Sequence, residues 1–302
     1  MSKNKIKRSP LFYVGDKYKL MAQISELFPK EINTFYEPFV GGGTVFLNIK
    51  ANQYFLNDIN AHLIKLHNTL ISYWDKEEIF FKVVNKIIMK YGLSRSYLED
   101  IVPESLKASW KKTYFAKFNK KGYTELRTHF NSTKQSSLLE LYVLLIYGFN
   151  RMLRFNSKGD FNLPVGNVDF NKNVVNALRE YFKIVRNRKI SLSDLDFRIF
   201  LERKFKKDDF VYVDPPYLIT FSEYNKYWDE QSERDLLKML DVLHENGVNF
   251  ALSNVILYKG RENILLSEWI KKYNVHPISS NYISYHNNSA KEITEVLITN
   301  YD

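Results

Sequence analysis

The 302-residue sequence contains no cysteine. Disulfide bonds, zinc–thiolate sites and thiol nucleophiles are therefore excluded, and the composition suits a reducing compartment. The six histidines are scattered, and none forms an HxxxH or HxH pair beside an acid. We therefore expect no metal site.

Long apolar runs are also missing. The basic N-terminal residues lead into Ser9 and Pro10, whereas a secretory signal peptide needs an apolar run there. The most apolar segment, Leu138 to Phe149, is too short to span a bilayer and contains Glu140. We expect a cytoplasmic protein without membrane contact, in which this segment is a buried helix.

Positive charge is in excess. The chain has 44 Lys and Arg against 34 Asp and Glu, a formal net charge of +10. This balance favours a polyanionic partner such as nucleic acid, although lysine-rich surfaces are often only solvated. With 45% hydrophobic residues, the chain can bury a substantial core and is expected to be globular.

Strand and helix patterns alternate at both ends of the chain. We expect an α/β fold with an open, mostly parallel Rossmann-like sheet and an antiparallel C-terminal hairpin. Ser232, with Asp235 three residues on, predicts the start of a helix that Gly247 ends. The predicted strands are 34–39, 53–58, 189–194, 210–214, 248–254, 275–284 and 292–301.

Residues 76–188 lack this alternation. They read as helices and loops, apart from one predicted hairpin between Arg154 and Val168. We therefore predict a catalytic domain of residues 1–75 and 176–302, and an inserted, mainly helical domain of residues 76–175 with a β-hairpin. Ligands of such sheets bind beyond the carboxyl ends of the strands.

Two of the predicted strand ends suit a nucleoside ligand. The segment from Glu37 to Gly43 contains consecutive glycines, which let a ligand approach the backbone, although it can equally be an ordinary tight turn. Asp58, at the end of the next strand, can accept hydrogen bonds from ribose hydroxyls. Its alternative role is to cap the following helix.

A third strand end carries the sequence Asp214-Pro215-Pro216-Tyr217. The exocyclic amine of a nucleobase is a poor nucleophile, and a carboxylate and a carbonyl that accept its N–H bonds would make its lone pair available. The prolines donate no hydrogen bond and fix the backbone, and the tyrosine offers a stacking face for an unstacked base. The alternative is a rigid turn after a strand.

These segments together resemble the Dam family of DNA adenine-N6 methyltransferases, class alpha, over essentially the whole chain. The resemblance implies transfer of a methyl group from S-adenosylmethionine to N6 of a flipped adenine in duplex DNA. It also implies a restriction–modification role with a separate cognate endonuclease. The matching segments are YVGDKYKL, YEPFVGGGTVF, NDIN, YGFNRMLRFNSKGDFNLPVG, VDPPY, LSN and EVLITNY.

The resemblance assigns residues to the methyl donor, without a metal and with S-adenosylhomocysteine as product. The residues that it implies as cofactor ligands are Tyr13, Lys17, Glu37, Pro38, Phe39, Gly41, Gly43, Asp58, Asp194 and Asp214. Asp214, Pro215, Pro216 and Tyr217 would hold the flipped base. Without the resemblance, Tyr13 and Lys17 would be read as ordinary surface residues.

The inserted region carries the expected contacts with DNA. Between Lys107 and Lys134 basic residues outnumber acids and alternate with aromatics, and we expect Lys117, Lys120 and Lys121 to contact phosphates. The alternative is a solvated helix face. The resemblance places a base-reading hairpin nearby, in which Arg154 would contact a guanine or, alternatively, a phosphate. Its expected DNA-binding residues are Asn150, Arg151, Met152, Arg154, Asn156 and Pro164.

The sequence departs from the family pattern in three places. Phe12 stands where family members that modify GATC carry a lysine, Arg151-Met152 follows Asn150 in place of a glycine-led pair, and the segment VGDK lacks the usual double glycine. These departures argue against GATC as the exact recognition site. Two other functions stay open: a DNA cytosine-N4 methyltransferase and a non-catalytic DNA-binding protein that retains the fold.

Overall fold

The computed structural model describes residues 5–99, 101–220, 228–279 and 293–302. It divides into two compact units, each described by itself below. The sheet unit comprises Lys17–Val40, Asn48–Ile59 and Arg188–Asp302, and the helical unit comprises Met1–Asp16, Gly41–Leu47 and Asn60–Asn187.

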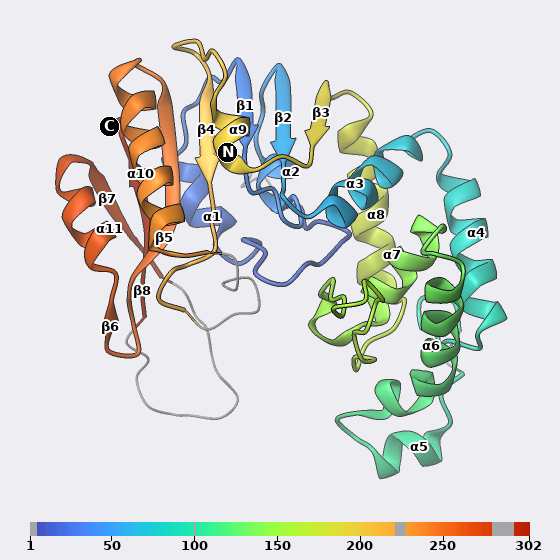
Figure 1. The fold of residues 1–302 in the computed structure, drawn as a ribbon. Coiled ribbons are helices and arrows are strands. Elements are labelled where there is room, and N and C mark those ends of the chain that lie inside the picture. Colours follow the sequence, from blue (N-terminus) through green and yellow to red (C-terminus); the bar gives the residue numbers. More distant parts are fainter. Residues whose placement is uncertain (1–4, 100, 221–227, 280–292) are drawn as a thin grey trace. The chain divides into compact units, whose positions relative to one another are not determined.

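The sheet unit contains a mixed sheet with the strand order β3-β2-β1-β4-β5-β8-β7, and β6 pairs with β5 (Figure 1). Strands β1 to β5 pair in parallel, whereas β8 is antiparallel to both β5 and β7. The predicted α/β sheet with an antiparallel C-terminal pair is thus confirmed. The strands are β1 Thr34–Glu37, β2 Gln53–Asn57, β3 Ile190–Ser193, β4 Phe210–Val213, β5 Asn249–Tyr258, β6 Arg261–Glu262, β7 Asn274–Ile278 and β8 Ile293–Thr299. Parts of the predicted strands 275–284 and 292–301 lie outside the described residues.

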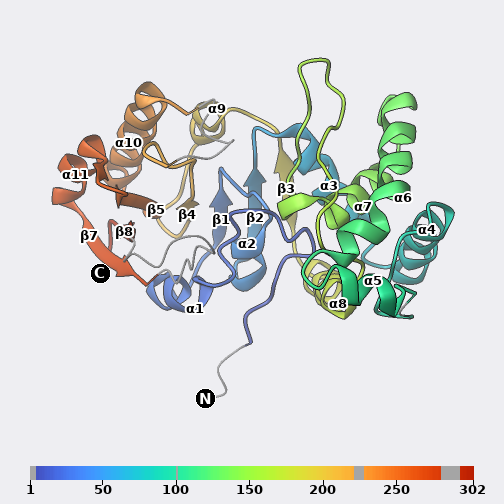
Figure 2. The same cartoon turned by 90° about the horizontal axis from the view of Figure 1, so that it is seen from below.

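Helices cover both faces of this sheet. Helices α9, α10 and α11 lie on one face, and α1 lies on the other (Figure 2). Alternation along β4 serves both faces: Val211 and Val213 join the core beneath α10, whereas the rings of Phe210 and Tyr212 pack on Phe28, with centroids 5.1 and 5.4 Å away. The helices are α1 Met21–Ile24, η1 Ser25–Leu27, α9 Phe197–Leu201, α10 Glu230–Glu245, α11 Ile264–Trp269 and η4 Ile270–Lys272.

The start of α10 differs from the prediction. Ser232 was expected to cap the helix, but the cap is Asp229, whose carboxylate accepts a hydrogen bond from the Ser232 amide at 2.8 Å. The polar residues between them join the helix as its first turn, where acids are favourable because of the helix dipole. The predicted end is confirmed, since Gly247 follows the C-cap with a φ of +69°.

The helical unit is built around α7, whose residues from Leu139 to Tyr147 are all buried. The predicted buried helix is therefore confirmed, and no helix among the described residues is both long and apolar enough to cross a membrane. The expected hairpin consists only of isolated antiparallel bridges, Phe155 to Phe161 and Gly148 to Val165. The helices are α2 Thr44–Asn48, α3 Ala61–Ser72, α4 Glu77–Lys90, α5 Glu104–Ser109, α6 Tyr114–Ser132, α7 Leu138–Tyr147, η2 Phe149–Arg151 and α8 Lys172–Val185.

A buried carboxylate on α10 contacts the segment before this helix, strand β5 and the segment before α11. Glu233 is fully buried, and burial raises the pKa of its carboxyl group. It accepts hydrogen bonds from Trp228 Nε1 at 2.8 Å, Asn254 Nδ2 at 3.2 Å and Asn263 Nδ2 at 3.0 Å. One side chain thus satisfies polar groups from three different parts of the chain.

Replacing this carboxylate should destabilise the sheet unit. In Glu233→Ala three buried donors lose their acceptor, so we expect the free energy of unfolding to fall by roughly 3 kcal/mol or more. Urea denaturation followed by tryptophan fluorescence measures the change. The matched control is Glu230→Ala on the exposed side of the same helix; equal stability of the two variants would contradict the role of Glu233.

Candidate functional site

Three of the predicted residues meet at the end of β4. Lys17 Nζ lies 2.8 Å from Asp214 Oδ2, and the Tyr217 hydroxyl donates to Asp214 Oδ1 at 3.0 Å. The Lys17 side chain is 6% exposed and that of Asp214 is 19% exposed. Because an ionised carboxylate can accept about four hydrogen bonds, these two contacts fix its orientation and leave acceptor capacity for a ligand.

Glu295 on β8 joins this cluster, although the sequence did not single it out. Its Oε1 lies 3.3 Å from the Tyr217 hydroxyl, which therefore bridges two carboxylates. Burial raises the pKa of the neighbouring Tyr212 phenol, and the charges of Asp214, Glu37 and Glu295 raise it further. The carboxylates therefore create a negative potential at this strand end, which favours a cationic ligand group. The feature that could have identified Glu295 from the sequence is its position as an acid within an otherwise apolar strand.

A second residue that the sequence analysis missed, Asn57, holds the ends of β1, β2 and β3 together. It is fully buried, and its Nδ2 donates to the carbonyls of Pro38 at 3.1 Å and Leu195 at 2.9 Å. Its Oδ1 accepts from the Leu195 amide at 2.9 Å. The strand ends that it joins carry three of the predicted acids, Glu37, Asp58 and Asp194.

Asp58 is not the cap of the next helix. Asn60 takes that role, because its Oδ1 accepts from the amides of His62 at 3.1 Å and Leu63 at 3.3 Å. The capping alternative for Asp58 was therefore wrong. Beside it lies Ile59, whose side chain is 67% exposed.

Apolar side chains accompany the acids at these strand ends. Leu195 follows Asp194 and is 36% exposed, and Ile59 follows Asp58. Phe39 packs against Phe197 with ring centroids 5.4 Å apart. Carboxylates next to exposed apolar side chains suit a ligand that has hydroxyl groups and a flat apolar ring.

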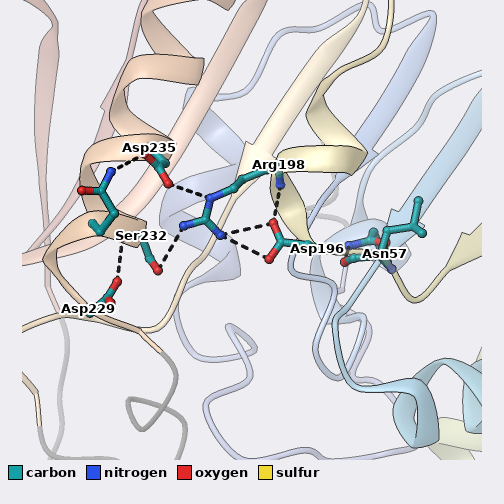
Figure 3. Close-up of polar contacts among 8 residues, drawn as sticks. Asn57, Asp196, Arg198, Asp229, Ser232 and Asp235 are labelled. Carbon is teal, nitrogen blue, oxygen red and sulfur yellow. Dashed lines mark hydrogen bonds and ion pairs between the residues drawn. The ribbon is translucent and has the colours of Figure 1, made fainter.

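Arg198 connects α9 to the first turn of α10 (Figure 3). Its guanidinium group contacts Asp196 at 3.2 Å, Asp235 at 2.7 Å and the Ser232 hydroxyl at 3.3 Å. The hydrogen bond from Arg198 holds the pKa of the Asp235 carboxyl below its usual range. These contacts fix the segment between β3 and α9, which contains Asp194 and Leu195.

In the helical unit, the glycine turn packs tightly. Gly43 has a φ of +78°, and a Cβ there would lie 2.4 Å from the ring of Phe46, so only glycine fits. A Cβ on Gly42 would approach the Tyr13 Cβ to 3.0 Å. The turn and Tyr13, both predicted from the sequence, therefore lie in contact.

His67 holds the same turn from α3. It is fully buried, and its Nε2 lies 2.8 Å from the carbonyl oxygen of Gly41. Burial lowers the pKa of the imidazole to about 4, so the ring is neutral at pH 7 and Nε2–H donates to that carbonyl. The sequence analysis missed this residue, because a single histidine on an apolar helix face has no distinctive pattern.

Side chains of α6 divide between an exposed face and a face that holds a neighbouring loop. Its exposed face carries the predicted phosphate contacts Lys117, Lys120 and Lys121. On another face, Arg127 and Asn131, four residues apart, donate to the carbonyls of Leu163 and Phe161, both at 3.0 Å. Gln135, which follows the end of α6, donates to the Gly159 carbonyl at 2.6 Å, so side chains hold the loop in place of a strand ladder.

The loop itself positions Arg154. Its Nε donates to Asn162 Oδ1 at 2.9 Å and its Nη2 to the Asn162 carbonyl at 2.8 Å, so the plane of the guanidinium group is set. Asn156 Oδ1 accepts from the amides of Lys158 and Asp160, both at 2.9 Å, which shapes the turn at the loop's tip. These contacts with Asn162 set the orientation of the Arg154 guanidinium group.

Five further residues lie on the short segment that precedes Arg154 or pair with it. Asn150 is exposed with a φ of +53°, and Arg151 and Met152 are half-buried. Phe149 was expected at the end of the buried helix, but it lies beyond α7 and is 51% exposed, and its amide donates to the carbonyl of the exposed Pro164 at 2.9 Å. An exposed aromatic ring beside a left-handed residue is available to a partner.

Comparison with known proteins gives consistent matches. The model of the D12 class N6 adenine-specific DNA methyltransferases matches residues 13–283. Type II methyltransferase M.FokI of Planomicrobium okeanokoites is 37% identical over 97% of this chain and 43% of its own length. Modification methylase StsI of Streptococcus sanguinis is 36% identical over 100% of this chain and 44% of its own length. The DNA adenine methylase of Haemophilus influenzae is 34% identical over 71% of this chain and 66% of its own length. The chain thus spans less than half the length of the first two relatives.

The buried His67 predicts a specific pH dependence. Its folded pKa of about 4 lies below the ordinary value of 6.5, so between these values the unfolded chain binds a proton that the folded chain does not. Stability should therefore fall by about 2 kcal/mol between pH 7 and pH 5. His67→Gln keeps a donor for Gly41 but removes the titration, so its urea-unfolding free energy should fall less. An unchanged pH dependence would contradict this.

Proposed function

Because the chain belongs to the D12 class N6 adenine-specific DNA methyltransferase family, we propose that it transfers a methyl group from S-adenosylmethionine to N6 of an adenine in duplex DNA. The observation that carries this proposal is the cluster of Lys17, Asp214 and Tyr217 at the end of β4. Its oriented carboxylate suits hydrogen bonds from an exocyclic amine.

The strand ends of the sheet unit fit the methyl donor. Asp58 would accept hydrogen bonds from the ribose hydroxyls, and the exposed Ile59 and Leu195 would contact the adenine ring near Asp194. Glu37 and its acidic surroundings suit the donor's positive charges. When bound, S-adenosylmethionine supplies an electrophilic methyl group on a sulfonium. The remaining proposed ligands are Tyr13, Lys17, Pro38, Phe39, Gly41, Gly43 and Asp214.

Asp214 would act on the target amine. By accepting an N–H bond, its carboxylate favours the pyramidal nitrogen whose lone pair can attack carbon. Lys17 and Tyr217 hold the carboxylate in one orientation, which avoids reorganisation during the reaction. Pro215 and Pro216 fix the backbone so that a carbonyl can accept the second N–H.

Tyr217 would also receive the flipped base. Its hydroxyl oxygen contacts both Asp214 and Glu295, so the far end of the ring is held in place. A fixed aromatic face stabilises an unstacked base by stacking. Glu295 therefore positions the platform without touching the reacting atoms.

The helical unit would bind the duplex. Lys117, Lys120 and Lys121 are exposed and would contact phosphates, and Arg154 would read a guanine. Phe149 and Asn150 would occupy the space that the extruded base leaves, as apolar wedges do in other complexes. One relative is named a type II methyltransferase and another a modification methylase, so we further propose a restriction–modification role with a separate endonuclease.

Loss of the carboxylate should stop the reaction. Asp214→Asn cannot accept the same charge-assisted bond, so we expect kcat to fall by at least about 100-fold, whereas donor affinity falls less because the other proposed donor ligands remain. Transfer of radiolabelled methyl groups to DNA measures it, with the exposed Asp208→Asn as control. Unchanged turnover would contradict the mechanism, and N4-methylcytosine as the product would contradict the choice of adenine.

Arg154 and the lysines of α6 should respond differently. Arg154→Ala should lower discrimination at one base pair by about 1 to 3 kcal/mol. Lys120→Ala should weaken binding to all sequences and reduce the slope of log affinity against log salt by about 1. Fluorescence anisotropy with duplexes of different sequence and salt separates the two, and an equal loss on every sequence in Arg154→Ala would make it a phosphate contact.

A further inference from the structure

Phe12, in the helical unit, is held rigidly in an unusual conformation. The ring is 6% exposed, and its φ of +48° is uncommon for a bulky residue. The segment around it is anchored, because the Tyr142 hydroxyl donates to the Pro10 carbonyl at 3.1 Å and the Leu11 amide donates to Ser9 Oγ at 3.2 Å. The position of the Phe12 ring is thereby fixed.

Two guanidinium groups lie over this ring. The Cζ atom of Arg151 is 4.4 Å from the Phe12 ring centroid, and that of Arg8 is 4.7 Å from it. Arg8 also forms an ion pair with Asp16 at 3.4 Å. Two cations beside this acid leave the Phe12 cluster, defined as Arg8, Phe12, Asp16 and Arg151, with a net positive charge.

Arg151 retains hydrogen-bonding capacity. Its Nε is buried and, within the described part of the chain, has no hydrogen-bond partner. Burial lowers the pKa of its guanidinium group, and the charge of Arg8 lowers it further. A buried donor that is left unsatisfied is costly, so internal packing alone does not explain the placement of this side chain.

The backbone at Arg151 is also unusual. Asn150 and Arg151 have consecutive φ values of +53° and +51°, a conformation that two non-glycine residues in succession rarely adopt. The Arg151 amide donates to the Gly148 carbonyl at 3.1 Å, which helps to keep this turn in place. Strained backbone of this kind concentrates at ligand-binding sites, where it sets the direction of a side chain.

Two of the departures from the family pattern, Phe12 and Arg151, meet here. Phe12 and Arg151 lie far apart in the sequence, yet the side chain of one stacks on that of the other. Arg151 also directly precedes the short segment that carries Arg154. Because the two positions are in contact, their departures from the family pattern change the same part of the surface. We expect such a change where a different recognition sequence is read.

We propose that Arg151, held by Phe12 and accompanied by Arg8, contacts a guanine of the recognition sequence at a base pair other than the one that Arg154 reads. This inference rests on the proposed function. An arginine can donate two hydrogen bonds to O6 and N7 of guanine in the major groove. Phe12 acts as a positioning residue, because stacking fixes the plane of the guanidinium group before DNA binds.

A base contact fits Arg151 better than a phosphate contact. Phosphates are bound by cations whose exact direction matters little, and the exposed lysines of α6 fit that task. Arg151 is half-buried and restricted by its backbone and by the Phe12 ring. Such restriction gains little for a diffuse phosphate but favours a directional, bidentate contact.

The test compares methylated sequences. Single-molecule sequencing of DNA from cells that express the wild type, Arg151→Ala or Arg154→Ala gives each recognition motif. We expect Arg151→Ala to lose the requirement for one guanine and Arg154→Ala to lose a different requirement. In vitro, discrimination by Arg151→Ala in kcat/KM between duplexes with and without that guanine should fall about 5- to 150-fold.

Two further variants separate direction from charge. Arg151→Lys keeps the positive charge but lacks the fork, so it should also relax that guanine position; a motif and discrimination like those of the wild type would overturn the proposal. Phe12→Leu keeps apolar packing and loses the stack, so it should relax the same position partly. These two variants decide the question if Arg151→Ala does not fold.

The control is Arg186→Ala, which removes an arginine 5.5 Å from the ring centroid of Trp74 in the same unit. It should leave the motif unchanged. A uniform loss of methylation at all sites in Arg151→Ala, with the motif intact, would make Arg151 a phosphate or structural residue and overturn the proposal. Absence of methylation by the wild type itself would instead contradict the proposed function.

Discussion

The ion pair between Lys17 and Asp214 is the contact on which the site in the sheet unit depends. It lies at the end of β4, and Tyr217 completes it by binding the second carboxylate oxygen. A carboxylate fixed on both sides presents its remaining lone pairs in a defined direction. Directional acceptors are what the amine of an adenine needs, because its lone pair must leave conjugation before it can attack a methyl group.

The surrounding fold keeps this contact in place through buried polar side chains. Asn57 joins three parallel strand ends, Glu233 joins α10 to Asn254 on β5, and Glu295 holds the hydroxyl of Tyr217. Each of these groups is buried and hydrogen-bonded, so its loss would leave partners unsatisfied. The helical unit uses the same principle when His67 binds the carbonyl of Gly41.

The sequence predicted the features that depend on local pattern. The spacing of hydrophobic residues and the turn residues located the strands and the buried α7. The acids at the strand ends were chosen because ligands of parallel sheets bind there. Glu295, Asn57 and His67 were missed because each acts through a partner that is distant in the chain. The predicted N-cap of α10 was wrong because Asp229 and Ser232 are both suitable capping residues, and Asp229 takes the role. The stack of Arg151 on Phe12 required the three-dimensional structure.

The most direct measurement of the central claim is a structure of the protein with duplex DNA and S-adenosylhomocysteine. The account predicts that the target adenine is extruded, with its N6 within about 3 Å of a carboxylate oxygen of Asp214 while Lys17 still contacts the other oxygen. A complex in which Asp214 faces away from N6, with the adenine held by other residues, would contradict it.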